Sequence, residues 1–245
     1  MIGLPAPFSL LALDRVGSTN DEARRLALEG AAADFLVVSA REQTTGRGRR
    51  GRVWVSPTGN LHCSTLLAIG RLAEAAQLGF VAAIALVDAL GALLPTAEFR
   101  CKWPNDVLVN GAKVAGMLLE PAGEGWLVLG VGVDVTVAPP AEMVAYPVQS
   151  LASLGYGGDA VAVLAAFCAA LGPWVERWRA EGFAPIRSAW LERCRGLGQP
   201  IVVRLEQDTV TGQFAGLDAD GALLLDQGAL GVRRLMAGDV FFPDR

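Results

Sequence analysis

The residues best suited to chemistry lie in the segment TTGRGRRGRVW, residues 44–54, where four arginines fall within six positions. Arg47, Arg49, Arg50 and Arg52 are interleaved with glycines, so high positive charge is combined with a backbone that can change conformation. Guanidinium groups grip phosphates and carboxylates bidentately. Three uses fit this composition: wrapping RNA, closing over a small polyanion, or solvation as an ordinary surface loop.

The lysines give a second signal. The chain holds 21 basic residues, and only two of them, Lys102 and Lys113, are lysine. Both fall in one twelve-residue window, either by chance in an arginine-rich chain or because this window needs a compact point charge that arginine cannot supply.

That window contains the motif KWPND, in which Asn105 and Asp106 present side-chain oxygens next to each other. Such a pair can hold Mg²⁺ against phosphates, and it is also common in ordinary Asx turns. The dipeptide Asn110-Gly111 predicts a two-residue hairpin turn, because both positions accept positive φ. This turn would bring Lys113 opposite Leu108 and its ammonium group near the Asn-Asp pair.

Other functional classes are poorly supported. GRGRRG formally fits the dinucleotide motif G-x-G-x-x-G, but a strand rather than a helix is expected after it. No phosphate-binding P-loop and no G-x-S-x-G elbow occur. A single histidine and four scattered cysteines make a zinc site improbable and favour free thiols in a reducing cytoplasm. A net charge of −4 argues against a general nucleic-acid binder. We find no signal peptide and no membrane-spanning apolar run.

The elements that must position these residues follow from periodicity and turn signals. A helix is expected over residues 18–30, with Thr19 as its N-cap, Glu22 completing a capping box and Gly30 ending it. Residues 99–120 are expected to form two strands joined at Asn110-Gly111. Further strands are expected at 8–14, 34–42, 52–56, 61–70 and 126–137, and further helices at 73–94, 159–182 and 184–194.

After a glycine-rich hinge at residues 196–198, the pattern changes to short strands and turns that are typical of a small all-β barrel. We therefore expect a domain over residues 1–196 and a second one over 197–245.

The segments STNDEA, EQTTGRGRRGRVW, KWPNDVLVNGAKVAGMLLE and GVGVDV resemble, in order and context, those of biotin–protein ligases, the biotin–[acetyl-CoA-carboxylase] ligases. The resemblance covers essentially the whole chain. It implies an α+β fold with a mixed, mainly antiparallel sheet, as in class II aminoacyl-tRNA synthetases, and a small C-terminal SH3-like barrel. It also implies a cytoplasmic enzyme without a tightly bound prosthetic group. That enzyme would activate biotin with Mg-ATP to biotinyl-5′-AMP and transfer biotin to a lysine of a carboxylase's biotin carrier domain.

The resemblance also assigns roles to particular residues. Lys113, Arg49 and Lys102 are implied to be catalytic, and Asp106 is implied to contact Mg²⁺. Implied biotin contacts are Ser18, Thr19, Asn20, Gln43, Arg47, Gly48, Arg49, Lys113 and Gly116. Implied ATP contacts are Arg49, Arg50, Trp54, Asn105, Asp106, Lys113, Asp134 and either Arg233 or Arg234. The Ser18-Thr19-Asn20 run also fits ordinary helix capping, and both roles can hold together.

The sequence departs from the family at two points. The catalytic pattern begins by about residue 8, so we expect no N-terminal helix-turn-helix domain. Asp134 stands where the family usually has asparagine, and a carboxylate near phosphates would repel them unless it holds Mg²⁺ or turns away. A lipoate–protein ligase and a nucleic-acid-binding module that uses the Gly/Arg loop are the alternatives. We expect no nucleic acid and no membrane as partner, and the sequence leaves a homodimer open.

Overall fold

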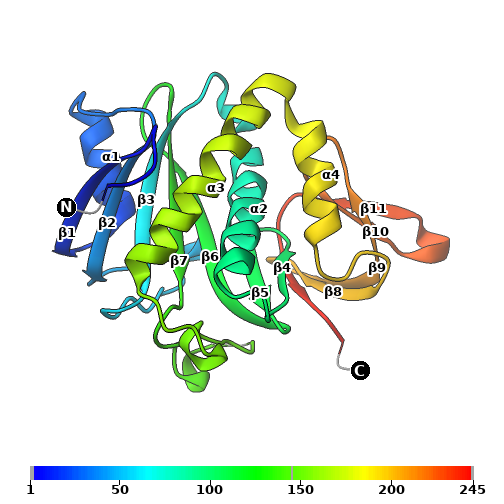
Figure 1. The fold of residues 1–245 in the computed structure, drawn as a ribbon. Helices are drawn as coiled ribbons and strands as arrows, with labels where there is room; N and C mark the ends of the chain where they lie inside the picture. The colour runs from blue at the N-terminus through cyan, green and yellow to red at the C-terminus, as the bar shows by residue number, and fades with distance from the viewer. Residues whose placement is uncertain (1–2, 145, 244–245) are drawn as a thin grey trace.

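The computed structural model describes residues 3–144 and 146–243, and its larger part is built on one seven-stranded sheet with the strand order β1-β2-β3-β7-β6-β5-β4 (Figure 1). Only β1 and β2 pair in parallel; every other neighbouring pair in this sheet is antiparallel. The strands are β1 (Ser9–Val16), β2 (Leu36–Gln43), β3 (Leu61–Ala68), β4 (Phe99–Lys102), β5 (Asp106–Val109), β6 (Ala112–Pro121) and β7 (Trp126–Val133).

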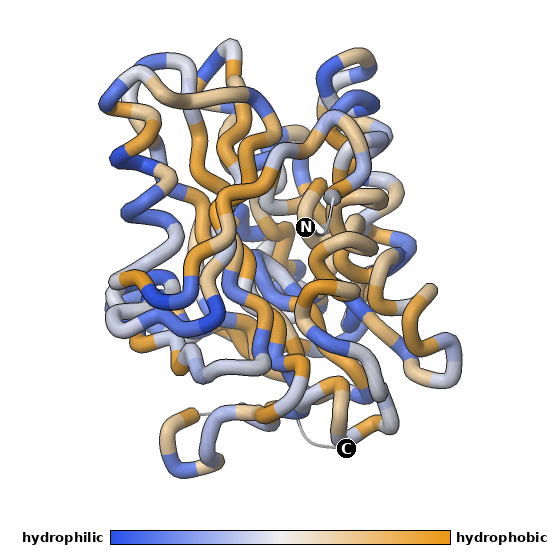
Figure 2. Tube along the Cα trace, turned by 60° about the vertical axis from the view of Figure 1, so that its left-hand side comes forward, coloured by the Kyte–Doolittle hydropathy of each residue, from blue (hydrophilic) through white to orange (hydrophobic). Residues whose placement is uncertain are grey.

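Successive residues of a strand point to opposite faces of the sheet, and both faces are covered. Val37 belongs to a large core shared with the long helices, whereas its neighbour Val38 belongs to a small cluster with Ala23 of the first helix. Figure 2 shows the apolar residues gathered along the central strands. The helices are α1 (Thr19–Leu28) on one face and α2 (Gln77–Leu93), α3 (Ala160–Glu181) and α4 (Phe183–Arg193) towards the other.

Helix α3 is long and apolar enough to cross a bilayer by length and composition. In the structure it packs against α2, and its side chains Phe167, Leu171 and Val175 are fully buried. The buried side of α3 is therefore part of the protein core.

A separate five-stranded antiparallel sheet with the order β11-β10-β9-β8-β12 forms the C-terminal part. Its strands are β8 (Pro200–Arg204), β9 (Thr209–Leu217), β10 (Leu223–Asp226), β11 (Val232–Leu235) and β12 (Asp239–Phe241). Trp103 joins the two parts, because its ring nitrogen donates to the carbonyl of Gly221 at 3.1 Å. The predicted α+β class, with a mixed, mainly antiparallel sheet and a small C-terminal β unit, is confirmed.

The hairpin prediction is also confirmed. Asn110 and Gly111 have φ values of 49° and 87°, and Lys113 pairs with Leu108. The expectation of only two strands over residues 99–120 is wrong, since the KWPND motif is itself a turn between β4 and β5. That turn brings Lys102 and Asp106 opposite each other.

Two local predictions fail for a common reason, which is that tertiary contacts replace the expected local ones. Residues 52–56 form no strand: only Val53 makes a bridge, to Arg47, and the chain leaves the sheet so that Trp54 can lie over β7. The N-cap of α1 is Ser18 rather than Thr19, and the Ser18 side chain makes no capping bond.

Candidate active site

A cavity of about 610 Å³ opens on the α1 face of the large sheet, beneath the Gly/Arg loop and beside the C-terminal sheet. Most of the residues singled out from the sequence line it, although they come from many different strands, helices and loops. Those residues are Ser18, Thr19, Asn20, Gln43, Arg47, Gly48, Arg49, Trp54, Lys102, Asn105, Asp106, Lys113, Gly116 and Asp134.

The end of the cavity near α1 is built from neutral hydrogen-bonding groups. The backbone N–H and the hydroxyl of Thr19 both donate to Oε1 of Gln43, at 2.8 and 3.0 Å. The Gln43 amide in turn donates to Ser56, at 3.0 Å, and Asn20 donates to Glu120 at 2.7 Å. Because these side chains hold one another, they present fixed donors and acceptors to a polar, uncharged ligand group instead of capping the helix.

Glycines on β6 and β7 form the floor of the cavity and allow Trp54 to lie directly on the strands. A side chain at Gly132 would collide with the Trp54 ring, and a Cβ at Gly116 would lie 3.2 Å from that ring and 3.1 Å from Lys113 Nζ. Gly130 leaves room for Asn20 in the same way. The floor is therefore flat, and the Trp54 ring and the end of Lys113 lie against the strand backbone there.

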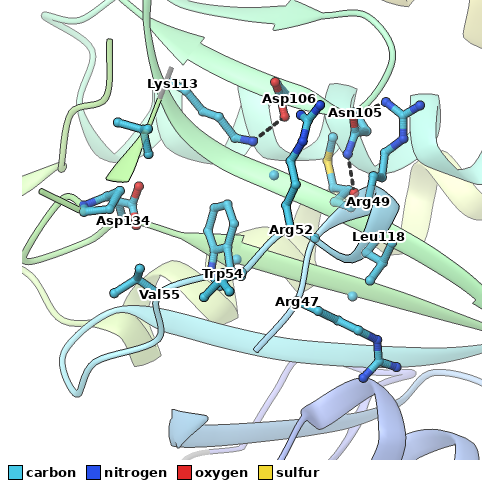
Figure 3. A pocket seen from close by; sticks show the side chains of 18 of the residues that line it. Arg47, Arg49, Arg52, Trp54, Val55, Asn105, Asp106, Lys113, Leu118 and Asp134 are labelled. Carbon is cyan, nitrogen blue, oxygen red and sulfur yellow. Dashed lines mark hydrogen bonds and ion pairs between the residues drawn. The ribbon is translucent and has the colours of Figure 1, made fainter. Parts of the chain in front are cut away.

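The opposite end is charged, and its centre is Asp106 between the two lysines of the chain. Lys113 Nζ lies 2.6 Å from Asp106 Oδ1 and Lys102 Nζ lies 3.4 Å from Oδ2 (Figure 3). Burial alone would raise the pKa of Asp106, but both ammonium groups outweigh it and keep that pKa below its usual value. Burial opposes a charged Lys113 as well, and the Asp106 carboxylate raises the pKa of Lys113 in spite of it. Lys102, Asp106 and Lys113 together therefore place two fixed positive charges around one negative charge.

Contacts of three arginines hold the Gly/Arg loop over this charged end. Arg49 donates to the side-chain oxygen of Asn105 at 3.0 Å, while the Asn105 amide donates to the carbonyl of Met117 at 2.6 Å. Arg52 forms an ion pair with Asp239 of β12, and Arg50 lies 3.6 Å from the same carboxylate. The C-terminal sheet therefore fixes one side of the loop.

Arg47 fixes the other side, at the base of the loop. Its guanidinium group pairs with Asp21 of α1 at 2.7 Å and with Glu120 of β6 at 2.9 Å, and it points towards α1 in Figure 3. These carboxylates occupy its donors, so Arg47 holds the loop in position in this conformation.

Asp134 is almost fully buried at the end of β7, where its Oδ1 accepts a hydrogen bond from Asn60 at 3.3 Å. Burial raises the pKa of Asp134 to about 7, although the charge of Lys113 acts to lower it. The carboxyl group at this point of the cavity is therefore neutral below that pH and ionised above it.

The structure does not bring two of the predicted residues to the cavity. Arg50 is not among the lining residues, because its side chain turns to Asp239. Arg233 lies on β11, the far edge of the C-terminal sheet, and pairs with Asp208 at 3.6 Å; the alternative Arg234 pairs with Asp218 and Asp220. In this conformation both arginines neutralise nearby carboxylates, and their assignment as ATP contacts stays a prediction.

Among the lining residues that sequence reasoning did not single out are four polar or aromatic ones, Tyr146, Arg204, Asp239 and Phe241. The Tyr146 ring centroid lies 5.2 Å from Lys113 Nζ and 5.5 Å from Lys102 Nζ, so it covers both ammonium groups. No motif surrounds any of the four, and they reach the cavity only through the packing of the C-terminal sheet and of the loop after β7.

A metal site made by protein groups alone does not fit the described part of the chain, in which no cluster of three potential ligands occurs. Both Asp106 oxygens face ammonium groups, which compete with any cation. Asp134 is the lining carboxylate that faces no arginine or lysine at ion-pair distance within residues 3–144 and 146–243.

Comparisons with known proteins agree with this geometry. A model of the biotin/lipoate A/B protein ligase family matches residues 13–134, and one of the biotin protein ligase C-terminal domain matches residues 196–242. A biotin–[acetyl-CoA-carboxylase] ligase of Paracoccus denitrificans is 45% identical over 242 residues, which cover 94% of this chain and 99% of the relative. The enzyme of the same name from Mycobacterium tuberculosis is 35% identical over 92% of this chain and 86% of its own.

A solved structure is similar over a comparable length. The biotin protein ligase from Aquifex aeolicus in complex with biotin and ATP superimposes with a TM-score of 0.81 at 27% identity, covering 95% of this chain and 97% of that one. The likeness therefore includes both the large sheet and the C-terminal unit.

Proposed function

The chain belongs to the biotin protein ligases, as a biotin–[acetyl-CoA-carboxylase] ligase, and from this premise we propose how its cavity carries out the reaction. Biotin and ATP bind side by side. The biotin carboxylate attacks the α-phosphate, a new carboxylate–phosphate bond forms, and the bond to the β-phosphate breaks, so that pyrophosphate leaves. The lysine amine of a biotin carrier domain then attacks the acyl carbon, loses a proton, and displaces AMP.

The observation that carries this proposal is the concentration of cationic side chains around one cavity in an acidic chain. A carboxylate and a triphosphate repel each other, and joining them requires fixed positive charge in a site with little water. Six cationic residues line the cavity here: Arg47, Arg49, Arg52, Lys102, Lys113 and Arg204. Lys113 and Lys102 are held by Asp106 in a buried position, so they need no reorganisation when phosphates arrive.

The two ends of the cavity suit the two substrates. The neutral side chains of Ser18, Thr19, Asn20 and Gln43, which line this end, match the uncharged ureido ring of biotin, which offers both donors and acceptors. The nucleotide then lies towards Lys102, Asn105 and Lys113, with Trp54 near the adenine and Gly116 leaving room at the point where the substrates meet. In this arrangement Lys113 contacts both the carboxylate and the α-phosphate.

The Gly/Arg loop protects the intermediate. A mixed anhydride is destroyed by water, and a loop that closes over it by means of Arg49 and Arg52 both shields it and completes the site. We propose that the loop opens between turnovers, since a few side-chain contacts, to Asn105 and Asp239, hold it over the charged end.

Magnesium enters this scheme as part of the Mg-ATP substrate. The protein alone offers no cluster for it in the described ranges, and Asp106 is neutralised by lysines. No step is therefore assigned to a resident metal ion. The four cysteines are free thiols, which supports our placement of the enzyme in the cytoplasm.

The test is transfer of biotin to a purified biotin carrier domain. We expect the intact mass of the carrier to rise by one biotinyl group when biotin, ATP and magnesium are all present. A carrier whose acceptor lysine is replaced by arginine is the control and should stay unmodified. An unmodified wild-type carrier under conditions in which the chain is folded would overturn the proposal.

A further inference from the structure

The C-terminal sheet contributes an unassigned cation to the cavity. Arg204 is the last residue of β8, and it lines the cavity together with Asp239 and Phe241 of the neighbouring strand β12. We propose that Arg204 binds the terminal phosphates of the nucleotide, those that leave as pyrophosphate. This inference rests on the proposed function, since it names a binding residue for one substrate of that reaction.

The position of Arg204 is set by an aromatic ring. Its guanidinium carbon lies 4.7 Å from the centroid of the Phe241 ring, and Lys102 Nζ lies 5.8 Å from the same centroid. A guanidinium group that packs on a ring keeps its N–H edges free for a second partner. Phe241 therefore holds Arg204 on the same side of the cavity as the Lys102–Asp106–Lys113 group.

The charges around Arg204 leave it without a carboxylate. Asp239 lies opposite Arg204 in the register of β12 and β8. The Asp239 carboxylate, however, forms its ion pairs with Arg52 and Arg50 of the Gly/Arg loop. Within the ranges 3–144 and 146–243, Arg204 makes no ion pair and donates no side-chain hydrogen bond. Arg204 is exposed, as Arg233 and Arg234 of the same sheet are, but those two arginines both pair with nearby aspartates.

The geometry of the cavity favours phosphate over the biotin carboxylate as the partner. The loop spans from Arg47, which is held at α1, to Arg52, which is held at β12. The neutral hydrogen-bonding groups lie at the α1 end, and Arg204 lies at the β12 end beside Lys102. A nucleotide whose α-phosphate is at Lys113 would extend its remaining phosphates towards the β12 end. At that end, Arg49 and Arg204 line the cavity and form no ion pair with a carboxylate among the described residues.

The test compares Arg204→Met with Arg233→Met. Methionine keeps an apolar stem against Phe241 and removes the charge, and Arg233 is a matched arginine on the far edge of the same sheet. The assay is biotin-dependent exchange of pyrophosphate into ATP, with separate KM values for ATP, pyrophosphate and biotin. A second assay supplies preformed biotinyl-5′-AMP and follows transfer to the carrier domain.

We expect Arg204→Met to raise the KM for ATP and for pyrophosphate about tenfold, the loss expected for one charge-assisted contact. Its KM for biotin and its transfer from supplied adenylate should stay within about twofold of the wild type, and Arg233→Met should match the wild type throughout. An unchanged KM for ATP, or an effect confined to the KM for the carrier domain, overturns the inference. Failure of the wild-type chain itself to catalyse exchange would instead count against the proposed function.

Discussion

Replacing Lys113 with methionine tests the charged end of the cavity most severely, because this residue is important for both stability and chemistry. Asp106 is 8% exposed, and the substitution removes its partner at 2.6 Å while Lys102 remains at 3.4 Å. Breaking a buried pair costs about 3–5 kcal/mol, and the remaining lysine favours the lower end of that range. We therefore expect the free energy of unfolding to fall by about 3 kcal/mol, measured by urea titration of tryptophan fluorescence.

The catalytic loss should be larger than this destabilisation explains. Removing one preorganised charge from a developing anionic centre slows reactions by about 10²–10³-fold. We expect that loss in biotin-dependent pyrophosphate exchange, assayed at a temperature at which the variant is fully folded. Adding Lys102→Met and Asp106→Asn to Lys113→Met removes all three charges of the buried group, so the triple variant should regain much of the lost stability and none of the exchange.

The triple variant also gives the outcome that refutes the reasoning. If exchange returns together with stability, then the single variant failed because it was poorly folded, and Lys113 has no direct part in adenylation. The same conclusion follows if Lys113→Met alone keeps exchange within tenfold of the wild type.

Other regions of the cavity yield further predictions. Because burial raises the pKa of Asp134 to about 7, its negative charge develops as pH rises through that value; the KM for ATP should therefore rise several-fold between pH 6 and pH 8, and Asp134→Asn should flatten this dependence. Trypsin should cut the wild-type chain between Arg47 and Arg52 at least tenfold faster without ligands than with biotin and ATP together, and equal rates would contradict a closing loop. Gly132→Ala should displace the Trp54 ring, cost about 1–3 kcal/mol of stability and raise the KM for ATP, whereas Gly70→Ala, with no atom within 4 Å of the added methyl group, should do neither.

The parts of the site that the sequence predicts well are those that depend on local backbone chemistry. The Asn110-Gly111 turn needs positive φ at both positions, and this requirement alone sets the register that brings Lys113 to Asp106. Periodicity located the long helices for a similar reason, since each buries one continuous apolar surface.

The parts that it misses depend on contacts between distant segments. Thr19 has the chemistry of an N-cap, yet it bonds to Gln43 of β2, and residues 52–56 have strand propensity, yet they leave the sheet so that Trp54 can cover Gly132. Arg204 and Arg233 cannot be distinguished by sequence, because only the strand order of the C-terminal sheet decides which of them faces the cavity.

Exchange of labelled pyrophosphate into ATP by the purified chain tests the central claim most directly, because it reports only the joining of a carboxylate to the α-phosphate. We predict rapid exchange with biotin and magnesium, and none when biotin is omitted or replaced by lipoate. Exchange supported by lipoate, or its absence in the presence of biotin, would contradict the account.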